Sequence, residues 1–260
     1  MRPLCSLIKR EFTAYFLSPI AYVVMAVLLA VTGLLFTNTL DLLTGSNTRG
    51  TEFPMQTLLG DERFWLVFLF IPALLTMRLF AEERGTGTLE VLMTAPIRDG
   101  QVVAGKYVAC VLFFLVLWLP TLIYVPVLTG LHAEHWWNPA TWSFAIDPRP
   151  VVTSYLGLVL AGMMFLAVGL LVSSLVKNQL VAAILALAVT LPFVVAAFWR
   201  PGLDPGSLLA RVIAFVSVPE HFRKDFCRGI LDTRHVVLYL STTALALLLT
   251  VRSLEARRLR

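Results

Sequence analysis

The chain has 260 residues, of which 58% are hydrophobic and 14% are charged. Soluble domains usually contain about 45–50% apolar and about 25% charged residues, so this composition excludes an ordinary soluble globular domain and indicates apolar faces that meet lipid. Basic loops beside anionic headgroups account for the formal net charge of +5. Because no aromatic–basic recognition motif accompanies this charge, we expect no nucleic-acid partner. The three widely spaced cysteines indicate neither a disulfide framework nor a metal-ligand pair.

The first segment, residues 1–17, has the pattern of an amphipathic helix. Its apolar residues recur every three or four positions, whereas Lys9 and Arg10 fall largely on the opposite face. This pattern predicts a helix in the membrane interface with its basic face toward the headgroups; a cytoplasmic helix packed on protein is the alternative. Glu11 interrupts any apolar core, which argues against a cleavable signal peptide. The predicted apolar face consists of Leu4, Leu7, Ile8, Phe12, Tyr15 and Phe16.

Six apolar stretches follow. A helix needs about 20 apolar residues, with a range of roughly 17–25, to cross the hydrocarbon core. Arg252 can reach the headgroups from the end of the sixth stretch, which is short. We therefore predict an all-α polytopic membrane protein in which residues 1–260 form one transmembrane domain with six transmembrane helices. The predicted spans are residues 19–40, 64–80, 107–130, 151–176, 180–198 and 236–251.

Basic residues in the short loops predict the orientation of these spans. When the long loop at residues 199–235 is set aside, one side of the membrane carries twelve Lys and Arg residues and the other carries three. Because such residues collect on the cytoplasmic side, we expect both termini and the loop at residues 81–106 in the cytoplasm. The 199–235 loop is then extracytoplasmic.

The loop at residues 81–106 carries the most specific motif of the chain. Thr88 is placed to cap a short helix whose first turn carries Glu90, near the positive end of the helix dipole. The helix must end before Pro96, since the residue preceding a proline is pushed out of the α region. Leu89 and Leu92 share one of its faces. A short helix with apolar and acidic residues is suited to docking into a groove on another protein.

The run Gly85-Thr86-Gly87-Thr88 is not a phosphate loop. A Walker A loop has the pattern G-x-x-x-x-G-K-[ST], in which the lysine reaches the phosphates, and no such pattern occurs in the chain. We therefore expect that the chain is not an enzyme and does not hydrolyse ATP by itself.

Small residues line the fourth predicted span. Gly157, Gly162 and Gly169 recur along residues 151–176. Small side chains let membrane helices approach closely, although glycine is also ordinary in such helices. The spacing alone leaves both interpretations open.

Two groups of histidines lie in the predicted outer loops. His132, Glu134 and His135 have the close spacing of metal ligands, but neighbouring tryptophans favour a solvated interfacial loop, and we expect no metal there. In the 199–235 loop, apolar residues around 208–216 predict a short surface helix. His221, beside Glu220, either contacts a substrate or partner or caps that helix, and the cap is the favoured interpretation.

The cytoplasmic motif resembles the signature of ABC-2 type permeases, the membrane subunits of ATP-binding cassette transporters. The matching run is Glu83-x-x-x-Gly87-Thr88-Leu89-Glu90-x-Leu92-x-x-x-Pro96-Ile97. The opening, from Ile8-Lys9-Arg10-Glu11-Phe12 to Ala21-Tyr22, is similar to the gliding-motility and nitrous-oxide-reductase-maturation branch of that family. The tail, from His221-Phe222 to Leu231-Asp232, is similar to the same branch.

The resemblance implies the permease subunit of an exporter that couples ATP hydrolysis by a separate ATPase subunit to the movement of an unidentified substrate. ATP and Mg would be bound by that partner, so this chain would hold no cofactor. Two permeases, either copies or paralogues, would pair with two ATPase subunits in the inner (plasma) membrane of a prokaryote. The implied ATPase-coupling residues are Glu83, Gly87, Thr88, Leu89, Glu90, Leu92 and Pro96.

Two other classes of function compete with the exporter. A secondary carrier would show ionisable residues inside the spans or repeated halves with broken helices, and the sequence has neither. A membrane scaffold or assembly factor, whose spans only anchor a complex, is the stronger alternative because it requires no special residues.

Overall fold

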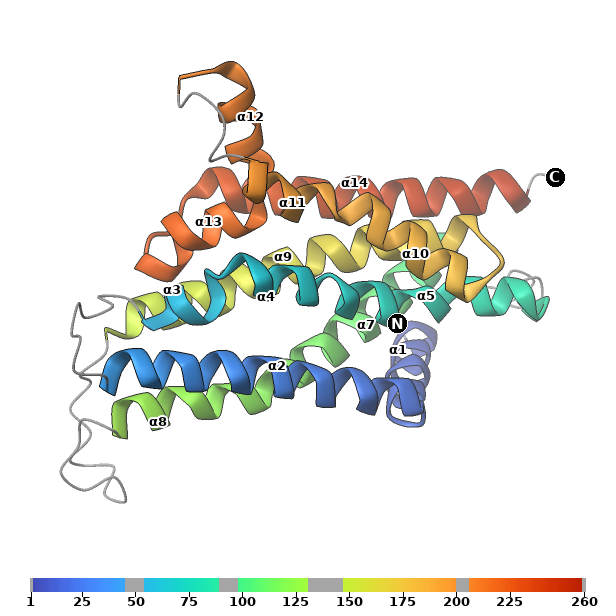
Figure 1. Ribbon diagram of the computed structural model, residues 1–260. Coiled ribbons are helices and arrows are strands. Elements are labelled where there is room, and N and C mark those ends of the chain that lie inside the picture. Colours follow the sequence, from blue (N-terminus) through green and yellow to red (C-terminus); the bar gives the residue numbers. More distant parts are fainter. Residues whose placement is uncertain (1, 45–53, 89–97, 131–146, 200–205, 259–260) are drawn as a thin grey trace.

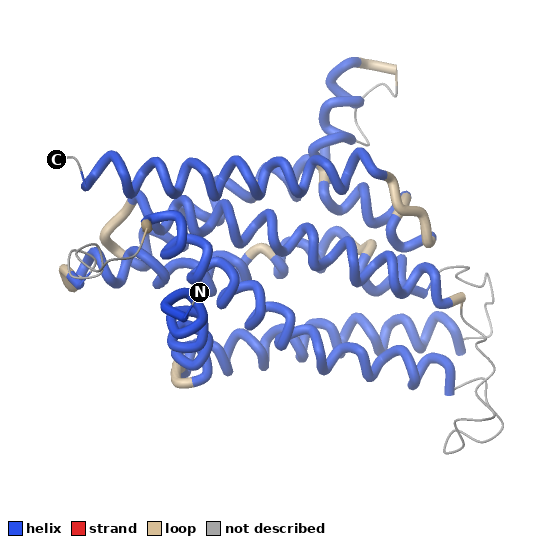
Figure 2. The backbone as a smooth tube through the Cα atoms, turned by 180° about the vertical axis from the view of Figure 1, so that it is seen from behind, coloured by secondary structure: helices blue, strands red, loops and turns tan. Residues whose placement is uncertain are grey.

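The computed structural model describes residues 2–44, 54–88, 98–130, 147–199 and 206–258, and every regular element within these ranges is a helix (Figure 1). The longer helices run side by side, whereas α1 lies across one end of them (Figures 1 and 2). The elements are α1 (Arg2–Phe16), α2 (Pro19–Thr44), α3 (Pro54–Leu59), α4 (Glu62–Phe68), α5 (Phe70–Gly85), α7 (Asp99–Trp118), η1 (Leu119–Ile123), α8 (Tyr124–Gly130), α9 (Pro148–Leu175), α10 (Gln179–Thr190), α11 (Pro192–Trp199), α12 (Leu208–Val216), α13 (Val218–Lys224), η4 (Phe226–Arg228) and α14 (Thr233–Arg258).

Four helical segments in the described residues are long and apolar enough to cross a membrane. They match the first, third, fourth and sixth predicted spans, and each extends beyond the predicted end on at least one side. Helices α10 and α11 form a pair that is bent by 43° at the break between them, and together they correspond to the fifth predicted span. Pro192, the first residue of α11, accounts for this bend because it has no backbone N–H. The four segments are Pro19–Asp41, Asp99–Val127, Pro148–Leu175 and Thr233–Ala256.

The second predicted span, residues 64–80, is not one continuous helix. It is divided at Leu69 into α4, which has 7 residues, and α5, which has 16, and neither alone reaches the length of a span. Pro72 gives the physical reason. It cannot donate a hydrogen bond to the carbonyl of Phe68, and Phe68 is the last residue of α4.

Polar caps define where the long helix α9 begins and where its successor starts. Asp147 accepts a hydrogen bond from the Arg149 amide at 2.9 Å, and Pro148 occupies the first turn of α9. After α9, Asn178 accepts from the Leu180 amide at 2.8 Å and caps α10. The two helices are therefore separated by a tight polar turn, as expected where a chain re-enters the membrane.

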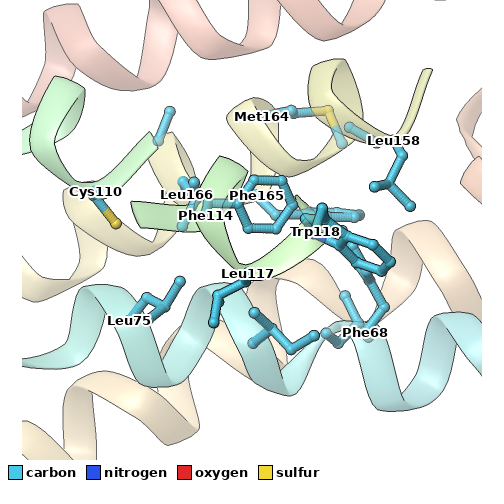
Figure 3. Close-up of a cluster of buried hydrophobic side chains, with 14 of the residues drawn as sticks. Phe68, Leu75, Cys110, Phe114, Leu117, Trp118, Leu158, Met164, Phe165 and Leu166 are labelled. Atoms are coloured by element: carbon cyan, nitrogen blue, oxygen red, sulfur yellow. The ribbon is translucent and has the colours of Figure 1, made fainter. Parts of the chain in front are cut away.

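Helix α9 lies at the centre of the bundle. In its most apolar 18-residue stretch 72% is buried by protein, against 28% for α2 and 22% for α14. It packs against α5, α7, α10 and α14. An aromatic cluster fills the space between α9, α7 and the α4–α5 break (Figure 3). Phe68 lies 6.0 Å from Phe114 and 6.1 Å from Phe165 between ring centroids.

The glycines of α9 are contact points. A Cβ atom on Gly169 would lie 2.2 Å from the Thr76 hydroxyl of α5, and one on Gly162 would lie 2.4 Å from the Phe114 ring of α7. On Gly157 it would meet the Phe226 ring at 2.8 Å. All three positions thus allow close approach between helices, and the structure confirms that interpretation of the spacing.

The predicted surface helix in the 199–235 loop is present as α12. The Ser207 hydroxyl accepts from the Ala210 amide at 3.1 Å and caps its beginning. His221, which is buried, lies with Nε2 at 3.2 Å from the Ala214 carbonyl and 3.1 Å from the Phe215 carbonyl, at the other end of α12. The favoured interpretation of His221 as a cap is therefore confirmed. Burial and the nearby His235 lower the pKa of His221 to about 3, so the ring stays neutral near neutral pH.

The Gly169 contact generates a stability prediction. Gly169→Ala should lower the unfolding temperature in detergent, because overpacking a tight contact costs about 1–3 kcal/mol and the Thr76 hydroxyl leaves no room for a methyl group. Gly100→Ala is the control, since a Cβ there meets nothing within 4 Å. Equal unfolding temperatures for the two variants would contradict the close-contact interpretation.

Candidate coupling site

The residues predicted to couple to an ATPase fall partly within the described ranges. Glu83, Gly87 and Thr88 are described, whereas the remaining four lie in residues 89–97, outside the described residues. The predicted short helix after Thr88 lies in the same segment. The C-terminal ends of α5 and α9 and the start of α7, with α1 packed against α7, are called the loop end below. Both ends of the chain also lie toward the loop end (Figures 1 and 2).

Helix α5 ends in a compact turn that begins the loop. Its C-cap, Thr86, donates its amide to the Glu82 carbonyl at 3.0 Å. Gly87 has a φ of 74°, a left-handed conformation that glycine adopts without steric cost and that commonly follows a helix. The Thr88 hydroxyl then lies 3.0 Å from the Thr86 hydroxyl and 3.4 Å from the Glu83 carbonyl. The glycine of the motif is therefore required by the backbone at this turn.

A buried ion cluster joins three helices at the loop end. Lys106 of α7 is 1% exposed, and its Nζ lies 2.7 Å from Glu83 Oε1 of α5 and 3.2 Å from Glu11 Oε1 of α1. Arg10 borders the cluster, with Nη2 at 2.8 Å from Glu11 Oε1 and 3.8 Å from Glu83 Oε1. The Lys106 ammonium also lies 5.4 Å from the centre of the Phe80 ring. One buried ammonium thus holds α1 and the end of α5 against α7.

The charges of this cluster favour an ionised Glu11. Burial by itself would raise the pKa of Glu11, but the charges of Lys106 and Arg10 and their hydrogen bonds outweigh it, so the pKa lies below its ordinary value of 4.5. The carboxylate of Glu83 has one buried oxygen, Oε2, without a hydrogen-bond partner in the described part of the chain. Because an isolated buried ammonium is very unfavourable, both carboxylates are needed to keep Lys106 in place.

Further polar contacts attach α1 to α5. Arg78 Nη2 donates to the Ala14 carbonyl at 2.9 Å, and its guanidinium carbon lies 5.2 Å from the centre of the Tyr15 ring. The Tyr15 hydroxyl donates to the Leu75 carbonyl at 2.9 Å. The first helix is therefore fixed to the bundle by directed interactions as well as by apolar contact.

The predicted apolar face of α1 meets protein over part of its area. Leu7 packs against Gly105 of α7, and Tyr15 stacks on the Phe113 ring at 4.8 Å between centroids. Both residues are buried, whereas Phe16 is exposed. Helix α1 thus buries part of its apolar face on α7, as the alternative of a helix packed on protein predicts. Phe16 stays partly exposed.

A cavity of about 360 Å³ lies between α1, α5 and α7 at the loop end. Its charged lining comes from all three helices and combines three carboxylates with two cations. Thr86 and Thr88 add hydroxyl groups to its rim. The cavity therefore has charged groups of both signs in its lining and adjoins Glu83 and Thr88 of the permease-like motif. The charged lining residues are Glu11, Glu82, Glu83, Arg78 and Lys106.

The partners of Glu83 were not recognised from the sequence. In the sequence, Lys106 belongs to the basic residues of the predicted cytoplasmic side, and Arg10 belongs to the predicted basic face of the first helix. One feature of the sequence does indicate an unusual cation. Lys106 directly precedes a long apolar run, where a charged side chain needs a partner. The helix α7 begins at Asp99 rather than at Tyr107, and this extension places Lys106 inside the bundle.

The ion cluster predicts a large cost for removing its cation. Lys106→Met should destabilise the protein by about 3 kcal/mol, because breaking a buried ion pair leaves charge uncompensated. Replacing Glu11 with Gln in the same chain should recover part of this loss. Thermal unfolding in detergent measures both effects. The control is Arg252→Met, whose exposed pair with Glu255 should contribute about 0–1 kcal/mol; equal losses in both single variants would refute the cluster's role.

The lowered pKa of Glu11 predicts a pH dependence. Because the folded pKa lies below 4.5, the pair with Lys106 stabilises fully above that pH and its contribution is lost as the pH falls through the folded value. The difference in unfolding temperature between the wild type and Glu11→Gln should therefore shrink between about pH 7 and about pH 3. A difference that stays constant over this interval would show that Glu11 does not titrate as described.

A comparison with protein families agrees with the motif. A comparison with curated proteins finds no match. The family model described as "ABC-2 family transporter protein" matches residues 55–216, which include α5, α7, α9 and the loop between α5 and α7. The match does not separate branches of the family, so the branch predicted from the two ends of the chain stays a prediction. Because the match covers more than half of the chain, the protein belongs to the ABC-2 family of transporter proteins, as a membrane permease component.

Proposed function

We propose that this protein is the permease subunit of an ATP-driven exporter and that a separate ATPase subunit engages it through residues 81–106. Family membership supports a membrane component of an ABC transporter. The observation that carries the coupling proposal is the buried cluster of Lys106, Glu83 and Glu11. It joins the helix that enters the loop to the helix that leaves it, and it adds α1 to the same unit.

The cluster gives the loop a mechanical route into the bundle. A partner that presses on residues 89–97 would move the end of α5 and the start of α7 together, because separating them would leave the Lys106 ammonium without its carboxylates. Helix α1 would follow through Glu11. ATP binding and hydrolysis on the partner would then shift the populations of two arrangements of the spans, which is how access alternates across a membrane.

The proposal also assigns the membrane topology of the chain. Helices α4 and α5 together would form one of six crossings, with the break at Leu69 inside it. The termini and the loop end would face the cytoplasm of a prokaryotic cell. Helix α1 would lie in the inner leaflet interface with Lys9 toward the headgroups, while Arg10 borders the ion cluster. A second permease, as a copy or a paralogue, would complete the membrane part and would be matched by two ATPase subunits.

A charge reversal in the loop tests the partner. Glu90→Lys should reduce co-purification of the ATPase subunit about tenfold, which corresponds to a loss of about 1.4 kcal/mol from a docking contact. The measurement is the ratio of ATPase to permease after affinity capture of the tagged permease from membranes, together with the ATP hydrolysis of the captured complex.

The control is Glu255→Lys, which reverses a partly exposed charge on α14, away from the ion cluster. It should leave both the subunit ratio and the hydrolysis rate unchanged. Full retention of the ATPase by Glu90→Lys would count against docking through this loop. If the wild type carries no ATPase at all, the scaffold function would replace the exporter.

A further inference from the structure

One buried hydroxyl links α9 to the backbone of α5 near the loop end. Ser173 Oγ accepts hydrogen bonds from the amides of Phe80 and Ala81, each at 3.1 Å, and donates to the Met77 carbonyl at 3.1 Å. The side chain is fully buried. The Met77 carbonyl is the ordinary partner of the Ala81 amide in an α-helix. The hydroxyl therefore bonds both the donor and the acceptor of one backbone pair of α5.

This arrangement differs from that of the neighbouring hydroxyl side chains. The Ser174 hydroxyl donates to Leu171 of its own helix at 2.7 Å, and the Thr76 hydroxyl donates to Pro72 of its own helix at 2.7 Å. Such bonds are the usual way in which helices satisfy serine and threonine. A hydroxyl has one donor and two acceptor sites, and Ser173 uses all three on another helix. Its bonding is thus directed between helices.

Other contacts hold the same two helices together around Ser173. Arg84 Nη1 donates to the Ser174 carbonyl at 2.5 Å, and a Cβ on Gly85 would meet the Lys177 carbonyl at 3.0 Å. One to two turns deeper, Gly169 admits the Thr76 hydroxyl. The last turns of α5 and α9 therefore run in close parallel contact. Among these residues, only Ser173 bonds both amides and a carbonyl of the other helix.

We propose that Ser173 is the positioning residue that transmits movement of the loop from α5 to α9, a proposal that rests on the function proposed above. Phe80 and Ala81, whose amides bond Ser173, lie within about two turns of Gly87 and Thr88, so a displacement of the end of α5 acts on these bonds. Helix α9 contacts α5, α7, α10 and α14. Helix α5 itself packs against α2, α7 and α10, but α14 packs mainly on α9, so α9 passes a displacement of α5 on to α14.

The chemistry of this backbone pair also predicts what removal of the hydroxyl does. In Ser173→Ala, the Phe80 and Ala81 amides and the Met77 carbonyl can bond within α5 as in a regular helix. No backbone group has to remain unpaired, so α5 persists and the protein assembles. What is lost is the directed link to α9. Ser174→Ala is a matched control, since it removes an adjacent buried hydroxyl and leaves the Arg84 contact to the backbone carbonyl intact.

Hydrogen–deuterium exchange on the complex captured with its ATPase tests the link. Exchange is compared between the nucleotide-free complex and the complex trapped with ATP and orthovanadate, in peptides covering residues 81–88 and 166–176. In the wild type and in Ser174→Ala, trapping should change the exchange of both segments. In Ser173→Ala, the change should persist in residues 81–88 and fall about fivefold or more in residues 166–176, the scale of a lost allosteric coupling.

Each outcome decides the proposal. A wild-type-sized change at 166–176 in Ser173→Ala overturns it, as does a wild-type complex in which trapping alters residues 81–88 alone. Neither result decides the proposed function, which is tested separately by capture of the ATPase with the wild type and by its loss in Glu90→Lys. If Ser173→Ala cannot be purified, Ser173→Cys replaces it, because the thiol keeps nearly the same size but bonds weakly; it should reduce the change at 166–176 to an intermediate value.

Discussion

A lysine ammonium buried at the end of a membrane bundle is the constraint from which the loop end is built. Lys106 is stable there only with carboxylates beside it, since a buried charge without partners costs far more than folding can supply. Glu83 and Glu11 meet this need from two other helices. The position of one cation therefore determines that α1, the end of α5 and the start of α7 meet at a single point. That point adjoins the segment by which the chain resembles ABC-2 permeases.

The interior of the bundle depends on a different interaction. In lipid the hydrophobic effect does little to join one helix to another, so close packing must hold them. Helix α9 provides it, because its glycines admit Thr76, Phe114 and Phe226 from three neighbouring elements. Aromatic rings then fill the space around the α4–α5 break (Figure 3). The most buried of the four candidate spans is thus one that has glycines at three of its contacts.

Both ends of the bundle are stabilised by polar contacts between elements, and the end opposite the loop also has ion pairs such as that of Arg223 with Glu62, 3.6 Å apart. At the loop end, charged and hydroxyl groups bond between helices: Lys106 joins side chains, and Ser173 joins a side chain to the backbone of α5. At the opposite end, a neutral imidazole, His221, closes the short helix α12 and bonds the Tyr239 hydroxyl at 2.8 Å. A directed bond between two helices specifies their relative position as well as their separation. We therefore expect such bonds to carry a displacement from one helix to the next better than apolar contact does.

The sequence by itself determined the class of the protein, the position of most spans and the family, because these depend on local composition and on motifs within a few residues. It left the role of the α9 glycines open, since their contacts depend on which helices become neighbours. It also predicted α12 and its histidine cap. Only the tertiary structure divided the second predicted span at Leu69, where Pro72 removes a bond that an apolar pattern does not register. Only the tertiary structure brought Glu11 to Lys106 and Ser173 to Met77, since each pair is separated by more than ninety residues and depends on which helices become neighbours.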